Sequence, residues 1–273
     1  MGILAEAPSA LEQGQIVYPT GTPFQLTSAE QRLLSPTWLQ GSTKNISFNS
    51  RTGDVRGTTA TGEDLAALEG LLSRFSAQAR DMVTDLFPQY REHLDLGLTS
   101  FRPAEVADRV SSWRKDDARL HVDAFPSRPL QGRRILRLFI NVGPRERRWY
   151  TGEPFEQVVE RFLPRVRAPL PATLWLLHRL HLTRGRRTLY DHYMLGLHDA
   201  MKADVEYQKS AGRTQVNFQP GTIWACYTDL VSHAVISGQF ALEQTFYLPV
   251  HAMQEPQRSP LRILERRLGQ PLV

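Results

Sequence analysis

Segments with the alternating pattern of β-strands form two groups in this chain, and a long helical stretch separates them. The first group lies in residues 118–142, where HVDAF and RILRLFINV stand on either side of the turn-rich PSRPLQG. The second group starts at Gln215 and runs through QVNF, TIWACYT, VSHAVIS and FALEQTFYLPV. Regular strand–helix alternation would indicate a parallel sheet, whereas this order favours an α+β protein with a β-core covered by helices.

Helical segments are predicted before the first strand group and between the two groups. Residues 62–92 have leucines at helical spacing behind Glu63 and Asp64, which suit the positive end of a helix. Residues 153–209 contain three helical segments, PFEQVVERFL, PATLWLLHRL and TLYDHYMLGLHDAMKADVEYQ. We therefore expect residues 153–209 to be a helical insertion between the two strand groups.

The two ends of the chain have weaker patterns. Residues 1–60 are rich in Gly, Pro, Ser and Thr, and we expect an irregular N-terminal part with short extended pieces near Gln15–Tyr18 and Ile46–Phe48. The segment Pro260–Val273 predicts a short basic helix or arm. At roughly 100–200 residues per domain the length allows one large domain or two small ones, and we interpret residues 1–273 as a single domain.

Arginine supplies most of the positive charge of the chain. The formal net charge is +5, and only four of the 33 basic residues are lysines. The planar arginine fork pairs bidentately with carboxylates and phosphates, which would suit an acidic partner, although a GC-rich genome would produce the same bias. Nucleic acid is not favoured as a partner, because no basic run is interleaved with aromatic residues.

The composition argues against several classes of protein. No apolar run reaches the roughly 20 residues that a membrane-spanning helix needs. The segment MGILAEAPSALEQG has neither a basic start nor a long apolar stretch, so we expect no secretory signal. Cys226 is the single cysteine, which precludes an internal disulfide and agrees with a reducing cytosol.

His121 and Asp123 are the strongest candidates for chemistry. They lie two residues apart in a predicted strand, so both side chains are expected on one face. Together they would supply two ligands of the 2-His-1-carboxylate triad of Fe(II) oxygenases, which leaves coordination positions open. His233 is the best candidate for the third ligand, because a Pro-Gly turn and then a strand precede it in NFQPGTIWACYTDLVSH. Jelly-roll barrels use such a setting to return a distal histidine to the first strand pair.

Four segments resemble the Kdo 3-hydroxylase family: HVDAFPSRPLQGRRILRLFINVGP, RRWYTGEPFE, YDHYMLGLHDAMK and NFQPGTIWACYTDLVSHAVISGQFALEQTF. The resemblance covers residues 40–250 and implies a double-stranded β-helix (jelly-roll) core covered by helices. It also implies an Fe(II)/2-oxoglutarate-dependent dioxygenase that consumes O2. The implied reaction is hydroxylation at C3 of 3-deoxy-D-manno-oct-2-ulosonic acid (Kdo), the acidic sugar linked to lipid A in lipopolysaccharide.

Two alternative functions stay open at this point. One is a related dioxygenase that acts on another acidic sugar or on a small metabolite. The other is a non-catalytic, cupin-like module that binds a sugar acid. Only an enzyme would convert 2-oxoglutarate and oxygen to succinate and carbon dioxide in the presence of its substrate.

The residue that binds the far carboxylate of 2-oxoglutarate is not obvious. Many related dioxygenases carry a basic residue about ten positions after the distal histidine, but AVISGQFALEQTFYLP after His233 has none. Arg137 is the candidate by strand parity, since it shares a predicted inward face with Phe139 and Asn141, opposite a fully apolar face. A buried arginine needs an anion, and a bound carboxylate would supply it.

Other partners for these groups are also consistent with the sequence. Arg137 could instead pair with a buried acid such as Glu243, and Arg128 and Arg134 are alternative anchors for 2-oxoglutarate. Asp229 is expected to orient His233 or to cap a turn rather than to bind iron.

Residues near the triad in the sequence are candidates for binding the sugar acid, with a solvated charge run as the alternative. They are Arg114, Lys115, Arg148 and Trp149. Among the remaining histidines, His178, His181, His192 and His198 are expected to be solvated or packed, with His192 and His198 also candidates for substrate contact.

The expected surroundings follow from the implied substrate. We expect a cytoplasmic protein that meets lipid A-linked Kdo at the inner membrane, with peripheral contact to that anionic surface as one option. No nucleic-acid partner is expected, and the oligomeric state is left open.

Overall fold

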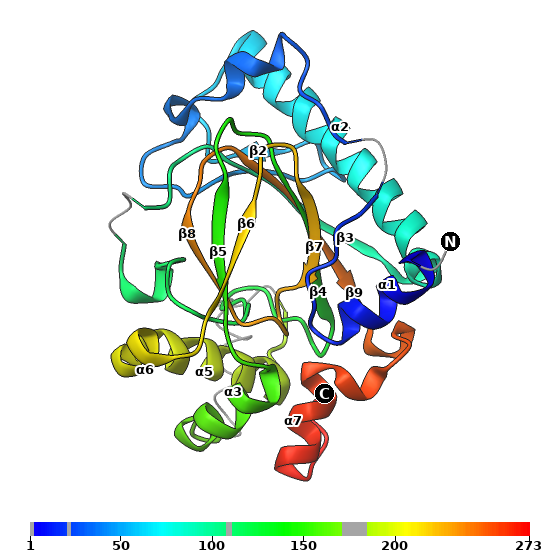
Figure 1. Ribbon diagram of the computed structural model, residues 1–273, viewed down its shortest axis with the longest axis vertical. Coiled ribbons are helices and arrows are strands. Elements are labelled where there is room, and N and C mark those ends of the chain that lie inside the picture. The colour runs from blue at the N-terminus through cyan, green and yellow to red at the C-terminus, as the bar shows by residue number, and fades with distance from the viewer. Residues whose placement is uncertain (1–2, 21–22, 108–110, 171–184) are drawn as a thin grey trace.

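Two antiparallel sheets lie at the centre of the computed structural model, which describes residues 3–20, 23–107, 111–170 and 185–273 (Figure 1). The larger sheet has the strand order β2-β1-β3-β9-β4-β7, and the smaller one has the order β6-β5-β8. The strands of the larger sheet are β1 (Ile46–Phe48), β2 (Val55–Arg56), β3 (Asp95–Arg102), β4 (Arg134–Asn141), β7 (Ile223–Tyr227) and β9 (Ala241–Leu248). Those of the smaller sheet are β5 (Arg147–Thr151), β6 (Thr214–Phe218) and β8 (His233–Ser237).

Helices cover the sheets from outside. The long helix α2 (Gly62–Leu86) runs along the larger sheet and buries Leu68, Leu72 and Phe75 against it (Figure 1). The other α-helices in the described part of the chain are α1 (Ile3–Glu12), α3 (Phe155–Phe162), α5 (Leu189–Ala203), α6 (Val205–Ser210) and α7 (Pro260–Leu268). Short 3₁₀ helices are η1 (Glu30–Leu33), η2 (Pro36–Trp38), η3 (Pro88–His93), η4 (Trp113–Lys115), η5 (Leu163–Arg165), η6 (Val250–Ala252) and η7 (Pro256–Arg258). Helices α3, α5 and α6 fall between β5 and β6, where a helical insertion is predicted.

Aromatic rings fill the space between the two sheets. Phe139 of β4 stacks on Trp224 of β7 at 5.2 Å, and Trp149 of β5 meets both rings edge-on. Phe218 of β6 stacks on Trp224 at 3.8 Å. Because these rings come from both sheets, they fix the distance between them and form one wall of the space in which the polar residues below lie.

The two faces of β4 differ as their sequence parity predicts. Leu136, Leu138 and Ile140 belong to the core that the helices cover, whereas Phe139 packs between the sheets. All eight residues of β4 are buried. The outer face is apolar because it packs in the core under the helices, and the inner face, between the sheets, carries Arg137.

Several elements differ from the sequence-based expectation. HVDAF does not form a full strand: it contributes a single antiparallel bridge between His121 and His233. The helix α1 and the strand β3 lie in segments where the sequence predicted no regular structure. In β3 the inward periodicity is interrupted by an irregular register between Leu96 and Thr99, which hides the strand pattern from a sequence reading.

Two further findings concern the helices. The segment PATLWLLHRL, which contains His178, and the following His181 lie outside the described residues. Within the described residues, no helix is both long enough and apolar enough to cross a membrane.

Candidate metal centre

The backbone joins His121 and His233 although they are distant in sequence. The His121 N–H donates to the carbonyl of His233 at 3.0 Å, and the His233 N–H donates back at 2.9 Å. This bridge adds the His121 segment to the edge of β8 and brings the two imidazole rings to a centroid distance of 4.6 Å. Trp149 stacks on the His233 ring at 5.3 Å and limits its rotation.

The two histidines share one orientation and one tautomer. His121 Nδ1 lies 2.7 Å from the carbonyl of Arg119, and His233 Nδ1 lies 2.8 Å from the carbonyl of Val231. A carbonyl only accepts hydrogen bonds, so both Nδ1 atoms carry the proton and both Nε2 atoms keep a lone pair. Burial lowers the pKa of both imidazoles and therefore favours the neutral form that binds metals.

Asp123 completes the set. Its backbone N–H donates to the carbonyl of Thr228 at 2.8 Å, and its Oδ1 lies 3.8 Å from His121 Nε2. Burial alone would raise the pKa of Asp123, but the charge of Arg137 outweighs burial and lowers it. The carboxylate is therefore ionised, as a metal ligand must be.

These three side chains fit a divalent metal ion. One donor atom from each of His121, Asp123 and His233 can be chosen such that all three lie within 4.8 Å of one another. Imidazole and carboxylate donors bind divalent metals at about 2.0–2.2 Å, so small side-chain movements would bring all three to one ion. Two neutral imidazoles with hydrogen-bonded Nδ1 atoms and one carboxylate are the donor set of non-haem Fe(II) oxygenases.

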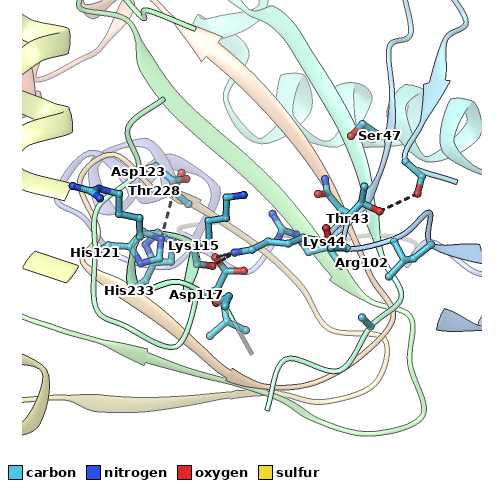
Figure 2. Close-up of a pocket in the computed structure, with 18 of the residues that line it drawn as sticks. Thr43, Lys44, Ser47, Arg102, Lys115, Asp117, His121, Asp123, Thr228 and His233 are labelled. Carbon is cyan, nitrogen blue, oxygen red and sulfur yellow. Dashed lines mark hydrogen bonds and ion pairs between the residues drawn. The ribbon is translucent and has the colours of Figure 1, made fainter. Parts of the chain in front are cut away.

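The triad lies at one end of a cleft of about 1400 Å³ (Figure 2). Figure 2 shows the triad and Thr228 on one side, Lys44, Lys115 and Asp117 in the middle, and Arg102 and Ser47 towards the other side. Of the residues that the structure describes, three acidic ones line the cleft: Glu105, Asp117 and Asp123. Eight basic ones line it: Lys44, Arg56, Arg102, Arg114, Lys115, Arg137, Arg147 and Lys202. Basic groups outnumber acidic ones, so the cleft favours anionic ligands.

Arg137 faces the cleft, as its strand parity predicts, but carboxylates already surround it. Its Nη2 lies 2.8 Å from Asp123 Oδ2, and its Nη1 donates to Glu243 Oε1 at 2.5 Å. The predicted alternative of a pair with Glu243 is therefore confirmed. Both of its terminal nitrogens already face carboxylates and only its Nε has no hydrogen-bond partner among the described residues, so Arg137 is less suited to receive the far carboxylate of 2-oxoglutarate than an arginine without carboxylate partners.

Arg147 is the cleft arginine that the sequence reasoning missed. It is 2% exposed, and its Nη1 donates to the carbonyl of Gly238 at 2.9 Å. Among the residues that the structure describes, no carboxylate lies within ion-pair distance of it, and its Nε has no hydrogen-bond partner. Burial and then the charge of Arg102 lower the pKa of Arg147, so its positive charge is poorly compensated. The signal in the sequence was the parity of RRWYT, which puts Arg147 on the face of Trp149.

Three other candidates for binding 2-oxoglutarate lie elsewhere, and the expectations for them are corrected. Arg134 is fully buried in an ion pair with Asp229, with Nε 2.7 Å from Oδ2, so Asp229 orients Arg134 rather than His233. Arg128 lines a separate cavity. The amide of Asn141 donates to the carbonyls of Arg145 and Phe218 and thus holds a turn.

Of the residues predicted to contact the substrate, some line the cleft and others lie away from it. Arg114, Lys115 and Trp149 line the cleft. Arg148 points to the other face of β5, where its Nε donates to Ser237 Oγ, so it does not reach the cleft and that prediction is corrected. His192 is half-buried, with its Nε2 2.9 Å from the carbonyl of Arg167, and it does not line the cleft.

Two residues of α5 add to the cleft beside the triad. The His198 ring meets the His121 ring edge-on at 5.4 Å, and its Nδ1 lies 3.0 Å from Asp199 Oδ1. Lys202 is 2% exposed, and its Nζ donates to the carbonyl of Arg114 at 3.0 Å. Both residues lie in the helical insertion, which therefore supplies part of the wall of the site.

Comparisons with known proteins agree with this geometry. A sequence model of the family described as 3-deoxy-D-manno-oct-2-ulosonic acid (Kdo) hydroxylase matches residues 3–271. The crystal structure of the Kdo hydroxylase KdoO, a non-haem Fe(II) α-ketoglutarate-dependent dioxygenase, in complex with α-ketoglutarate and Fe(III) is 44% identical, with a TM-score of 0.95. The alignment covers 99% of this chain and 92% of that one. A second structure of KdoO, in complex with cobalt(II), is 45% identical over the same shares of the two chains, also with a TM-score of 0.95. No curated protein matches the chain.

Proposed function

The chain belongs to the family of Kdo hydroxylases, and from that premise we propose that its cleft hydroxylates Kdo with Fe(II), 2-oxoglutarate and O2. The observation that carries this function is the triad of His121, Asp123 and His233 at one end of a basic cleft. The enzyme is an Fe(II)/2-oxoglutarate-dependent dioxygenase, and its substrate is an acidic sugar.

Bound iron with 2-oxoglutarate and O2 supplies the oxidising chemistry that replaces a C–H bond by C–OH. His121, Asp123 and His233 would hold the iron. The side chains of this protein then have three tasks: to bind the two organic substrates, to orient them, and to keep the reacting groups away from bulk water. The wall of aromatic rings around Trp149 and Phe139 serves the last task next to the triad.

We infer that Arg147 binds the far carboxylate of 2-oxoglutarate, the role that the sequence had favoured for Arg137. Arg147 is a buried cation without a carboxylate partner in the described part of the chain, and a bound anion would remove the cost of that isolation. It lies two residues before Trp149 on one face of β5, and Trp149 covers the ligand His233. Two residues of a strand span about 7 Å, so Arg147 lies one strand repeat from the ring that covers His233, and both residues line the same cleft.

The sugar would lie on the side of the cleft where Arg114, Lys115 and Lys202 meet His198. These residues bring positive charge and one imidazole to the neighbourhood of His121. The Kdo carboxylate is the group that they would recognise. A volume of about 1400 Å³ exceeds the roughly 300–1,000 Å³ of small-molecule sites, so the cleft has room for more than 2-oxoglutarate and one sugar.

The finer description of the substrate is also part of this proposal. We infer that Kdo is linked to lipid A when it is hydroxylated at C3, and that the protein meets it from the cytoplasm at an anionic membrane surface. The supporting observations are the spare volume of the cleft and its excess of basic groups, which suit phosphates as well as carboxylates.

For the fold, we propose a double-stranded β-helix that extends over a single domain. The order β3-β9-β4-β7 in one sheet and β6-β5-β8 in the other, with the His121 segment bridged to β8, is the arrangement expected of two interleaved Greek keys. The strands β1 and β2 then extend the larger sheet at one edge.

The experiment combines purified protein, Fe(II), 2-oxoglutarate and O2 with Kdo linked to lipid A, and follows succinate and the sugar by mass spectrometry. One added oxygen makes the product sugar about 16 mass units heavier, and succinate should form in equal amount, because the chemistry couples the two. Succinate without a heavier sugar would point to another substrate. Absence of both products would favour a non-catalytic, sugar-binding module.

A further inference from the structure

The carboxylate of Asp123 presents its two oxygens to different partners. Oδ1 lies 3.8 Å from His121 Nε2, on the side of the imidazole lone pairs. Oδ2 lies 2.8 Å from Arg137 Nη2. The outer torsion of an aspartate side chain is broad, so rotamer preference alone would not keep the two oxygens in these places.

Arg137 is held in place by Glu243 on the side away from Asp123. Its Nη1 donates to Glu243 Oε1 at 2.5 Å, and the hydroxyl of Thr245 donates to the same oxygen at 3.1 Å. Arg102 donates to Glu243 Oε2 through Nε at 2.9 Å and Nη2 at 2.5 Å. Glu243 is 1% exposed, so these charge-assisted bonds are little weakened by solvent.

The result is a chain of alternating charges that ends on the metal ligand: Arg102, Glu243, Arg137 and Asp123. Glu243 and Arg137 lie on the neighbouring strands β9 and β4, so the chain is anchored to the rigid part of the larger sheet. The two ion pairs place one terminal nitrogen of Arg137 on Glu243 and the other on Oδ2 of Asp123, while its Nε has no hydrogen-bond partner among the described residues.

We propose that Arg137, fixed by Glu243, is a positioning residue that restricts Asp123 to a single metal-binding oxygen. The proposal rests on the proposed function, since it concerns the metal of that site. Carboxylates bind divalent metals through one or both oxygens. If Asp123 used both, it would take one of the three positions that the triad leaves open, and a 2-oxo acid needs two of these. Arg137 thus keeps room for the co-substrate without touching it.

The test uses Co(II), whose visible absorption reports binding and changes in coordination without turnover. Co(II)-loaded protein is titrated with 2-oxoglutarate and, separately, with pyruvate, which has the same 2-oxo acid but no second carboxylate. In Arg137→Met, Co(II) should remain bound, and the affinity for both acids should fall by the same factor. We expect a fall of roughly tenfold or more, since removing a group that orients a metal ligand typically costs about 10–100-fold in activity.

Two further variants keep the test decisive. Arg137→Met leaves Glu243 with fewer partners and could unfold the protein, so the double variant Arg137→Met/Glu243→Gln removes both charges together, which buried pairs tolerate better. It should show the same equal loss. Arg147→Met is the matched contrast, because it should weaken 2-oxoglutarate and leave pyruvate unchanged.

Each other outcome contradicts the proposal in a distinct way. If Arg137→Met weakens 2-oxoglutarate alone, Arg137 binds the far carboxylate directly. If neither acid is weakened, Asp123 keeps one oxygen on the metal without help. If folded Arg137→Met loses Co(II), Arg137 is needed for the metal and not for the open position. If the unmodified protein binds Co(II) no better than His233→Ala, the triad is not the metal site and the proposed function fails as well.

Discussion

Two buried arginines of the same strand have opposite surroundings. Arg134 lies at the start of β4 and pairs with Asp229, and both side chains are completely shielded from solvent. Arg137 lies three residues later on the other face, between Asp123 and Glu243, at the wall of the cleft. Both are arginine–carboxylate contacts of similar length, so contact geometry does not separate structural from functional roles.

The two ion pairs differ in how many oxygens of the carboxylate contact the arginine. Asp229 uses both oxygens on Arg134, with distances of 2.7 Å and 3.1 Å, and has nothing left for a ligand. Asp123 gives one oxygen to Arg137 and keeps the other on the side of two imidazoles. A buried ion pair marks a functional site here only where one of its members has an unused coordinating atom.

A third arginine extends the contrast. Arg147 is as buried as the other two, but among the described residues it meets a carbonyl and no carboxylate. Arg134 pairs with both oxygens of one carboxylate, and Arg137 is shared between two carboxylates. Arg147 has no carboxylate partner among the described residues. The expected roles are structural support, positioning of Asp123, and binding of a mobile anion.

The largest effect is expected from the triad, on which the contrast between Asp123 and Asp229 depends. His233→Ala should abolish turnover and weaken metal binding, because it removes one of three ligands. Turnover is measured as succinate formation and metal content by elemental analysis. His251→Ala, at an exposed histidine of η6, is the control and should behave like the unmodified protein. Full activity in His233→Ala would show that the triad does not hold the metal, so that Asp123 would not differ from Asp229 as a metal ligand.

A smaller but selective effect is expected at Arg147. Arg147→Met should raise the KM for 2-oxoglutarate roughly tenfold or more, because a charge-assisted contact contributes about 1.5–3 kcal/mol. The matched control is Arg148→Met, which changes the neighbouring arginine on the exposed face of the same strand. An unchanged KM in Arg147→Met would return the anchor role to Arg137.

We expect the ion pair of Arg134 and Asp229 to contribute to the stability of the fold and not to metal binding. Asp229→Asn should lower the free energy of unfolding by about 3–5 kcal/mol, since it leaves a buried charge without its partner. Urea denaturation gives this value, and Co(II) titration of the folded fraction should give an unchanged affinity. A loss of Co(II) affinity in folded Asp229→Asn would mean that the two pairs are not independent.

The smallest effect concerns a pair in the middle of the cleft, Lys44 and Asp117, 2.7 Å apart. Burial alone would raise the pKa of Asp117, but Lys44 and Arg102 outweigh it and lower this pKa to about 2. A carboxyl whose pKa is lower in the folded state stabilises the protein above its unfolded pKa of about 3.9. It loses that contribution as pH falls towards the folded value.

Lys44→Met should therefore lower stability by at most about 2 kcal/mol above pH 4 and make it less dependent on pH between 4 and 2. Thermal unfolding across this range measures the change. Lys209→Met, at an exposed helical pair with Glu206, is the control, and it should leave the pH dependence as it is. An identical pH profile in Lys44→Met would show that Asp117 is held by other groups.

The sequence predicted the site better than its surroundings. Alternation along the chain put His121 with Asp123, and Arg137 with Phe139, and all four residues line the cleft, although the His121 segment forms a single bridge and not the predicted strand. Parity reports which face a side chain occupies and says nothing of what lies opposite. The partner of Arg134 is 95 residues away, and the bond of Arg147 to Gly238 spans 91 residues. Such pairings depend on tertiary packing, so a local pattern could propose Arg134 as an anchor but could not reveal that Asp229 already occupies it.

We propose that the triad of His121, Asp123 and His233 binds Fe(II) in a form that accepts 2-oxoglutarate. The most direct measurement is an anaerobic titration of the Fe(II)-loaded protein with 2-oxoglutarate, followed by visible absorption. We predict a weak charge-transfer band that saturates at one 2-oxoglutarate per chain, because a 2-oxo acid that chelates Fe(II) produces such a band. No band in the folded, iron-loaded protein, or an equal band in His233→Ala, would contradict the claim.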